Sequence, residues 1–316
     1  MAAQQLARKM QNNSLTIVTV AKEPLKILLR FVAWHREHGA DHIRIYLDDP
    51  EDPAIATLER LDYVTITRCT PQFWKSIGVD PEDRFTKRQN AALTHGYRAT
   101  PAGWVGVNDA DELFYSQTRP LKKFLAALPR KTRAVRFATA EIVHSDAPGH
   151  HFRTMMGKKQ SHSLYGPSAG LIKRNGGLVG HNEGKSIIRA GLDVSQIRQH
   201  FAEDQDGAQI TDRVVGHDEG CFILHLIDEG YESWRGKLDW RMNSWGFTGR
   251  MLAGLQGLQN GETDTEDEFR KLYSSLHRFS PEQIIELQGY GAYVSVPEDL
   301  MNPARRLFPE TFAPET

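Results

Sequence analysis

The chain has little cysteine, no long apolar run and almost no net charge. Cys69 and Cys221 are the only cysteines among 316 residues, which is too few for a disulfide framework or a zinc cage. No window approaches the roughly 20 apolar residues of a membrane span, and the N-terminal segment MAAQQLARKMQNNS lacks the apolar core of a signal peptide. A net charge of −1 lacks the basic surplus typical of nucleic-acid binders. We therefore expect a cytoplasmic protein with no nucleic-acid partner and at most a peripheral membrane association.

What is present is an ordinary globular composition with an α/β pattern. Hydrophobic residues make up 40% and charged residues 25% of the chain, as in proteins with a sizeable core. The order strand, helix, strand, helix, strand near the N-terminus predicts a parallel sheet with right-handed crossovers. The expected strands are 15–20, 42–47, 63–68, 104–107, 134–143, 185–189, 199–201 and 221–227, and the expected helices are 24–39, 53–61, 84–98, 231–260 and 268–288.

Three segments lack a clear periodic pattern. Residues 71–82 are expected to form a loop, and 144–183, rich in Gly, His, Ser and Lys, a long functional loop. The Pro-rich tail after 294 reads as an extended arm. Thr118 is the expected cap of a helix that Pro129 stops. We divide the chain into a polar segment 1–13, a main domain 14–240 and a helical C-terminal extension 241–316.

The most informative stretch is Trp104–Val107 with the acids that follow it. This short apolar run reads as a buried strand, yet it leads into Asp109, Asp111 and Glu112. Adjacent buried carboxylates repel one another, and a bound cation would remove the conflict. Asp109 and Asp111 are two residues apart, so in extended geometry they leave the strand on one face and hold a hard divalent ion there. The alternative is a solvated acidic turn without metal.

Several separated pieces resemble one family. The chain is similar to inverting glycosyltransferases of the GT-A fold, in the family-2-like branch related to glycosyltransferase family 92, over about residues 14–240. The pieces that carry the resemblance are Ala21-Lys22-Glu23, the run from Arg30 to Gly39 with Trp34 and His35, the run from Asp41 to Asp48, Arg88-Gln89-Asn90, the D-A-D-E turn, Lys185–Arg189, His225, Tyr231–Trp234 and Lys237.

The resemblance implies a fold and an activity. The expected fold is a GT-A, Rossmann-like, mostly parallel sheet flanked by helices. The implied enzyme moves a sugar, with inversion, from a nucleotide-sugar donor, a UDP-sugar in the first instance, to a glycan or lipid-linked saccharide acceptor in polysaccharide biosynthesis. Mn²⁺ or Mg²⁺ would neutralise the leaving diphosphate, since both ions prefer oxygen ligands.

The resemblance and this chemistry together imply the site residues. Asp109, Asp111 and His225 are the expected metal ligands, and a core histidine is the alternative for His225. The expected donor-binding residues, at strand ends, on the helix before the acidic turn and among later basic side chains, are Glu23, Asp48, Arg88, Asn90, Asp109, Lys185 and Lys237. The sequence does not single out the general base among Glu183, Asp146, Asp193, Asp218 and Glu219. We favour Glu183, which lies in a Gly-flanked segment, with Asp218 as second choice.

The sequence also departs from the family pattern and leaves rivals open. Leu47 occupies the position of the usual Asp, so a nucleoside contact would pass to Asp48 or Asp49. A nucleotidyltransferase would need a Gly-rich phosphate loop after the first strand, and Ala21-Lys22-Glu23-Pro24 has no glycine. A metal-dependent phosphodiesterase and a non-catalytic carbohydrate-binding relative are the remaining alternatives.

Overall fold

A computed structural model describes residues 13–243, 248–259 and 265–312, which form two compact units. Unit 1 contains the described chain up to Ala138, Gly184–Ile223 and the segment from Leu300 onward, and unit 2 contains Thr139–Glu183 and Leu224–Asp299. This division differs from the boundary expected at residue 240. The chain crosses between the units several times, so each unit is built from segments that are distant in sequence. Of the expected N-terminal segment 1–13, all but Asn13 lies outside the described residues.

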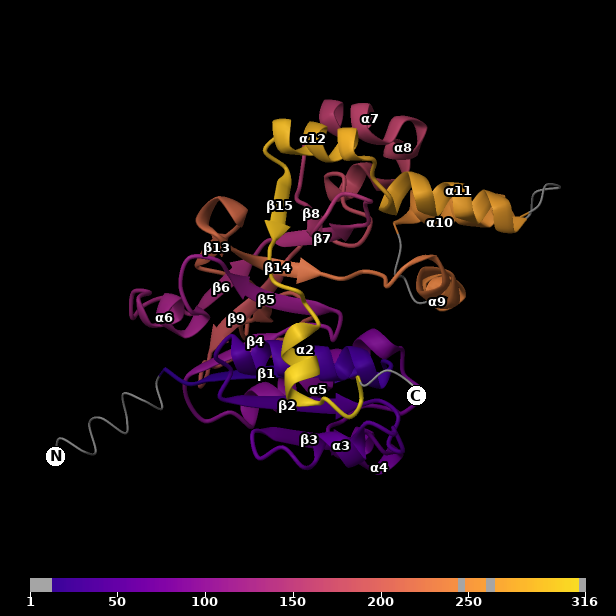
Figure 1. The fold of residues 1–316 in the computed structure, drawn as a ribbon. Helices are drawn as coiled ribbons and strands as arrows, with labels where there is room; N and C mark the ends of the chain where they lie inside the picture. Colours follow the sequence, from indigo (N-terminus) through magenta and orange to yellow (C-terminus); the bar gives the residue numbers. More distant parts are fainter. Residues whose placement is uncertain (1–12, 244–247, 260–264, 313–316) are drawn as a thin grey trace. The chain divides into compact units, whose positions relative to one another are not determined.

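Unit 1 is built on a seven-stranded, mostly parallel sheet (Figure 1). Strands β1, β2, β3 and β4 run parallel, whereas β9 is antiparallel to both of its neighbours, β4 and β6. The order is β13-β6-β9-β4-β1-β2-β3, with β1 at Leu15–Ala21, β2 at His42–Leu47, β3 at Val64–Arg68, β4 at Trp104–Val107, β6 at Ala134–Phe137, β9 at Lys185–Arg189 and β13 at Arg213–Val215. The direction of strand addition reverses between β1 and β4, so the carboxyl ends of these two strands flank a topological switch point.

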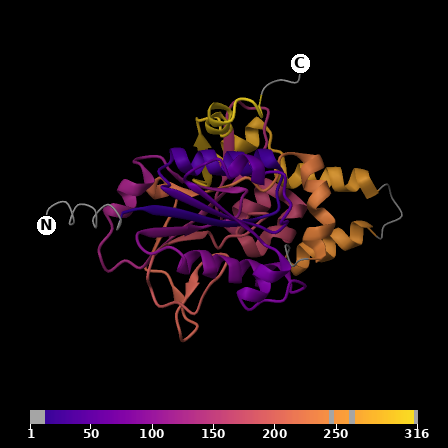
Figure 2. The same ribbon diagram turned by 90° about the horizontal axis from the view of Figure 1, so that it is seen from below.

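Helices cover both faces of this sheet. Helix α2 (Leu25–Glu37) lies on one face and α5 (Phe85–Arg98) on the other (Figure 2). Side-chain alternation explains this sandwich: Val18 packs in the cluster that contains the apolar side chains of α5, and its neighbour Ile17 points to the opposite face. On that face Gly106 of β4 is required, because a Cβ there would lie 2.8 Å from Ile17 Cδ1 and 2.9 Å from the ring of Phe114.

Shorter elements complete unit 1. Helix α13 packs against α2, where Arg306 forms an ion pair with Glu37. The remaining elements are α3 (Ile55–Leu58), α4 (Pro71–Ser76), β5 (Glu112–Ser116), α6 (Leu121–Ala126), β10 (Gln196–Ile197), β11 (Ala202–Glu203), β12 (Gln209–Ile210), the 3-10 turn η3 (His217–Glu219) and α13 (Asn302–Leu307). Strand β14 (Cys221–His225) carries the chain from unit 1 into unit 2.

Unit 2 combines three antiparallel strands with helices. Strand β8 pairs with β7 and with β15, and the buried Glu141 of β7 lies opposite Arg153 of β8. The elements are β7 (Thr139–Val143), β8 (His150–Arg153), α7 (Lys158–Tyr165), η1 (Gly166–Ser168), α8 (Ala169–Ile172), η2 (Lys173–Asn175), α9 (Tyr231–Asn243), α10 (Gly249–Gln259), α11 (Thr265–His277), α12 (Pro281–Gly289) and β15 (Tyr293–Val296).

Strands 42–47, 104–107 and 185–189 occur at the expected bounds, and the class is mixed α/β as predicted. The loop predicted at 71–82 is wrong for its first half, because Thr70 accepts the Phe73 N–H and Pro71 follows it, which starts α4. The single strand expected at 134–143 is two. Its break is at Ala138, whose N–H donates to Val215 O at 2.8 Å and whose carbonyl accepts from Ile223 N–H at 2.9 Å.

Other expectations fail for related reasons. Residues 199–201 are not a strand, since the His200 carbonyl accepts from the side chain of Ser186 and not from a ladder partner. Residues 144–183 contain β8, α7, α8 and the 3-10 turns η1 and η2, so about half of the predicted loop is regular structure. The predicted tail holds β15 and α13. Pro120 and not Thr118 occupies the N-cap position of α6.

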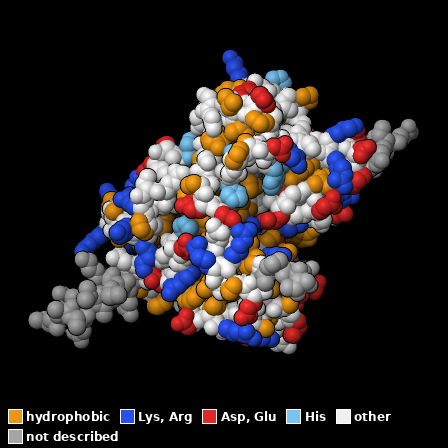
Figure 3. Space-filling model, viewed as in Figure 1, with side chains coloured by type: hydrophobic (Ala, Val, Ile, Leu, Met, Phe, Trp, Pro, Cys, Tyr) orange, Lys and Arg blue, Asp and Glu red, His pale blue; other side chains and the backbone are white. Residues whose placement is uncertain are grey.

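The described helices and the surface agree with the composition. None of the helices in the described ranges is long and apolar enough to cross a membrane. On the face drawn in Figure 3, basic and acidic side chains lie interspersed, as the near-zero net charge leads one to expect.

Candidate functional site

The acidic stretch after β4 is a tight turn. The Asp109 carbonyl accepts the Glu112 N–H at 3.0 Å, and β5 begins at Glu112. Asp109 and Asp111 therefore occupy the first and third positions of a four-residue turn. The expectation that strand alternation places them on one face is wrong, because the strand ends at Val107. The turn keeps both side chains at the carboxyl end of β4, beside the switch point.

A buried lysine is the first counter-charge of this turn. Lys185, the first residue of β9, is fully buried, and its Nζ lies 2.7 Å from Asp109 Oδ2 and 3.0 Å from Glu112 Oε2. Burial by itself would lower the pKa of Lys185, but the carboxylates of Asp109 and Glu112 outweigh it and raise that pKa. The repulsion that the sequence attributed to a missing cation is thus relieved in part by the protein itself.

Asp111 is the carboxylate that remains. Its side chain is partly exposed and makes no hydrogen bond or ion pair with any residue in the described ranges. Asp109 is 35% exposed and accepts from Gln89 Nε2 at 2.6 Å, so part of it also faces solvent. Asp111 is thus the acid of the turn whose charge no residue of the described ranges offsets by an ion pair or hydrogen bond. A divalent cation would offset that charge, and oxygen ligands suit Mg²⁺ and Mn²⁺.

His35 positions β5, which follows the turn. Its Nε2 accepts the Phe114 N–H at 3.2 Å, and Asn108 Nδ2 donates to the Glu112 carbonyl at 2.6 Å. Burial lowers the pKa of His35 to about 3, so the ring is neutral and can accept this hydrogen bond. The histidine that contributed to the family resemblance is therefore a structural residue that fixes the acidic turn.

The carboxyl end of β2 carries an ion pair. Asp48 accepts two hydrogen bonds from the Arg88 guanidinium, one of them 3.1 Å long, and Arg88 also lies 5.1 Å from the ring centroid of Trp74. Leu47 is fully buried in the core, so the acidic side chain at the end of β2 is supplied by the next residue, Asp48. The sequence analysis predicted Asp48 and Arg88 as separate donor-binding residues, and in the structure they form an ion pair.

Two further donor-site predictions lie in unit 1. Glu23 is half-buried just after β1, at the other side of the switch point. Asn90 of α5 has a buried Oδ1 with no hydrogen-bond partner in the described part of the chain. Gln89 belongs to the Arg88-Gln89-Asn90 piece but was not among the predicted site residues; its side chain donates to Asp109 and accepts from Gln199. Its position directly before Asn90 in the sequence could have indicated Gln89 as a site residue.

Three predicted residues belong to unit 2. His225 ends β14, its ring stacks on that of His181 with centroids 5.2 Å apart, and its Nδ1 is 3.7 Å from Glu141 Oε2. Lys237 lies half-buried on α9, and Glu183 is the exposed last residue before the chain returns to unit 1. Metal binding by His225, phosphate binding by Lys237 and base catalysis by Glu183 stay predictions.

Glu141 is a buried acid that the sequence did not single out. Its Oε1 accepts from Arg153 Nε at 2.9 Å, and its two oxygens accept the N–H groups of Val179 and Gly180 at 2.8 and 2.7 Å. Burial alone would raise the pKa of Glu141, whereas Arg153, His225 and the two N–H groups together lower it to about 2. Glu141 is thus an ionised structural carboxylate that anchors the 179–180 backbone.

Asp218, the second choice for the general base, is exposed on the turn after β13. Strand β13 is separated from β4 by β6 and β9. Three strand spacings of about 4.8 Å put it roughly 14 Å from β4, so the structure does not bring Asp218 together with the acidic turn.

No protein-family model matches this chain, and a search of the curated proteins finds no significant match.

Proposed function

We propose that the chain is a metal-dependent glycosyltransferase whose donor, a nucleoside diphosphate sugar such as a UDP-sugar, binds in unit 1. The single observation that carries this proposal is Asp111, a partly exposed carboxylate at the carboxyl end of β4 that makes no hydrogen bond or ion pair with any residue the structure describes. In open α/β sheets this edge, next to the switch point, is where ligands bind.

The order of the sheet supports the finer proposal that the fold is GT-A. The parallel set β3-β2-β1-β4 is continued by the antiparallel β9 and then by β6. In this arrangement Glu23, Asp48 and the acidic turn all follow the carboxyl ends of adjacent parallel strands. A nucleoside would contact the side of β1 and β2, and the diphosphate the side of β4.

The residues present divide the work as follows. Asp111 and the exposed part of Asp109 would hold Mn²⁺ or Mg²⁺, which offsets the charge that develops on the leaving diphosphate. Lys185 donates a hydrogen bond to Asp109 and fixes its orientation. Arg88, oriented by Asp48 and Trp74, presents a cation at the β2 end. The acceptor would be a hydroxyl of a glycan or a lipid-linked saccharide.

Thermal unfolding of the purified chain with UDP, GDP or CMP, with and without Mn²⁺, tests the proposal. A nucleoside diphosphate at 100 times its Kd should stabilise the fold by about 2.7 kcal/mol, which corresponds to a rise in Tm of roughly 5–11 °C, and only when Mn²⁺ is present. Asp111→Asn should abolish this shift, whereas the exposed control Asp62→Asn should keep it. An absence of any nucleotide response would refute the proposal.

A successful binding test would be followed by an activity test. Release of UDP from UDP-sugars, with and without saccharide acceptors, separates a transferase from a non-catalytic relative. Release of nucleoside monophosphate in place of the diphosphate would indicate a phosphodiesterase.

A further inference from the structure

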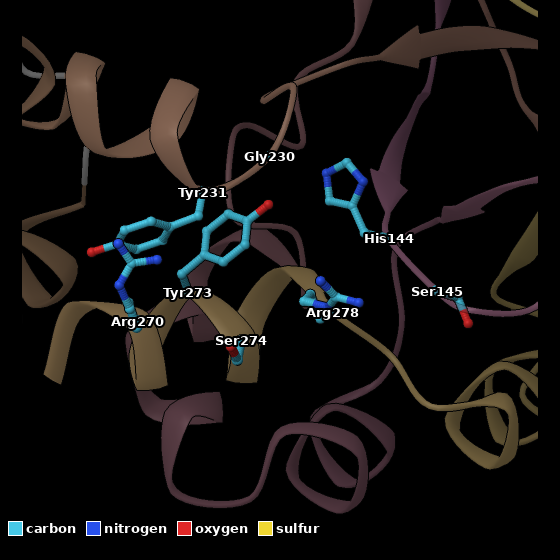
Figure 4. A pocket seen from close by; sticks show the side chains of 8 residues that line it. All are labelled: His144, Ser145, Gly230, Tyr231, Arg270, Tyr273, Ser274 and Arg278. Carbon is cyan, nitrogen blue, oxygen red and sulfur yellow. The ribbon is translucent and has the colours of Figure 1, made fainter. Parts of the chain in front are cut away.

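Unit 2 contains a pocket that shares no residue with the site proposed above. Its volume is about 300 Å³, at the lower end of small-molecule pockets and suited to a monosaccharide-sized ligand. Side chains from β7, α9 and α11 or their ends converge on it (Figure 4). The lining residues that matter are His144, Tyr231, Arg270, Tyr273, Ser274 and Arg278.

Helix periodicity explains the basic wall. Arg270, Ser274 and Arg278 are spaced four residues apart along α11 and its C-terminal end, so they lie on one face. At 1.5 Å per residue the two arginines start roughly 12 Å apart along the helix axis. The neighbouring stripe, Tyr273 and His277, is buried, and their rings stack with centroids 4.8 Å apart. One helix thus supplies two cations to the pocket and a rigid aromatic support beneath it.

A buried carboxylate fixes the other groups without facing the pocket. Asp228 Oδ1 accepts from His144 Nε2 at 2.6 Å, from the Tyr273 hydroxyl at 2.9 Å and from Gly230 N–H at 2.9 Å. His277 Nδ1 lies 2.7 Å from the other oxygen. Asp228 is therefore surrounded by donors, and no carboxylate lines the pocket itself. His144 Nε2 and the Tyr273 hydroxyl face Asp228, and the Tyr231 hydroxyl donates to Glu266 Oε1 at 2.6 Å. The lining therefore offers a ligand the guanidinium groups of Arg270 and Arg278 and aromatic rings.

The present partners of the two arginines are weak competitors. Arg278 pairs at 3.2 Å with Asp146, which is 87% exposed. Arg270 pairs at 3.2 Å with Glu232, which is 82% exposed, and lies 3.6 Å from Glu266, which is 46% exposed. Ion pairs of this exposure contribute little, because water competes with both partners. Arg270 also lies 4.1 Å from the ring centroid of Tyr231, which orients its guanidinium. A bound oxyanion can replace these acids and be held bidentately.

We propose that this pocket binds a monosaccharide-sized ligand that carries an oxyanion, either a carboxylated or a phosphorylated sugar. The guanidinium groups recognise the anion, and the tyrosine rings pack against the sugar body. The inference does not rest on the proposed function of unit 1.

Isothermal titration of the full chain tests this inference, with glucuronate and glucose 6-phosphate as probes and glucose and inorganic phosphate as controls. One or both anionic sugars should bind, and glucose should not. Which of the two binds more tightly identifies the anion as carboxylate or phosphate. No binding of either probe, or binding of inorganic phosphate as tight as that of the sugars, would overturn the assignment.

The variants are chosen to separate binding from folding. Arg278→Gln removes a guanidinium whose only side-chain partner in the described chain is an exposed acid, so it should fold normally and raise the Kd at least tenfold. Arg174→Gln, an exposed arginine of unit 2 outside the pocket, should leave the Kd unchanged. Asp111→Asn should also leave it unchanged. Equal Kd values for Arg278→Gln and Arg174→Gln would reject the pocket as the binding site.

Discussion

Replacing Lys185 by methionine should destabilise unit 1 strongly. The substitution keeps most of the side-chain volume but removes the ammonium that lies 3.0 Å from Glu112, whose carboxylate is fully buried. Breaking a buried ion pair by removing one partner costs about 3–5 kcal/mol, since a charge is left uncompensated. Asp109 is 35% exposed, so we attribute the effect to Glu112 and discount Asp109.

The assay is thermal unfolding by differential scanning calorimetry. For a unit of this size, 1 kcal/mol corresponds to about 2–4 °C, so Lys185→Met should lower the Tm of the unit 1 transition by about 6–20 °C. The matched control is Lys122→Met, which removes an exposed ion pair with Asp41 and should change the Tm by less than about 4 °C. The double variant Lys185→Met/Glu112→Gln should recover much of the loss because no unpaired buried charge remains.

Metal dependence makes the same prediction sharper. In the natural chain the Lys185 ammonium repels a cation at Asp109, whereas the variant lacks this ammonium. Mn²⁺ should therefore raise the Tm of Lys185→Met more than that of the natural chain. If Lys185→Met unfolds at the same temperature as Lys122→Met, the reasoning about the acidic turn is wrong.

Three further predictions concern backbone strain, acid stability and the β2 edge. Gly184→Ala should lower the free energy of unfolding, measured in urea, by about 1–3 kcal/mol. The φ of Gly184 is +71°, and a Cβ there would lie 2.2 Å from the Phe137 carbonyl oxygen. The control Gly191→Ala, where φ is +80° but no atom lies within 4 Å of the added Cβ, should lower it less. The pKa of Glu141 is lowered to about 2, so its contribution to the free energy of unfolding is present above pH 4.5 and is lost as the pH falls from 4.5 toward 2. In Glu141→Gln this loss of stability with falling pH, roughly 3 kcal/mol, should be absent. Arg88→Gln should leave Asp48 without its cation and weaken nucleotide binding in the Mn²⁺ thermal-shift assay, and unaltered binding would count against a donor role for the β2 edge.

Local pattern was sufficient for the elements that frame the site. The runs at 42–47 and 185–189 became strands at the expected bounds, and 84–98 became α5 with a one-residue shift at its start, because side-chain alternation and helical periodicity act over a few residues. The acidic turn after Val107 was also visible, since three carboxylates directly after an apolar run are conspicuous in any sequence. Thr70 and Pro71 illustrate the opposite case, a local start signal for α4 that was present in the sequence and overlooked.

The composition and the short-range pattern thus determined by themselves the mixed α/β class, the strand before the acidic turn and the turn's surplus of negative charge. Only the tertiary structure decided which charge faces which. Lys185 is 76 residues from Asp109 and meets it because β9 inserts antiparallel beside β4. Sheet order is a long-range property, set by how the whole chain buries its apolar faces, so the counter-ion could not be read from spacing. Because Lys185 holds Asp109 and Glu112, the carboxylates of the turn that we propose for the cation are Asp111 and the exposed part of Asp109.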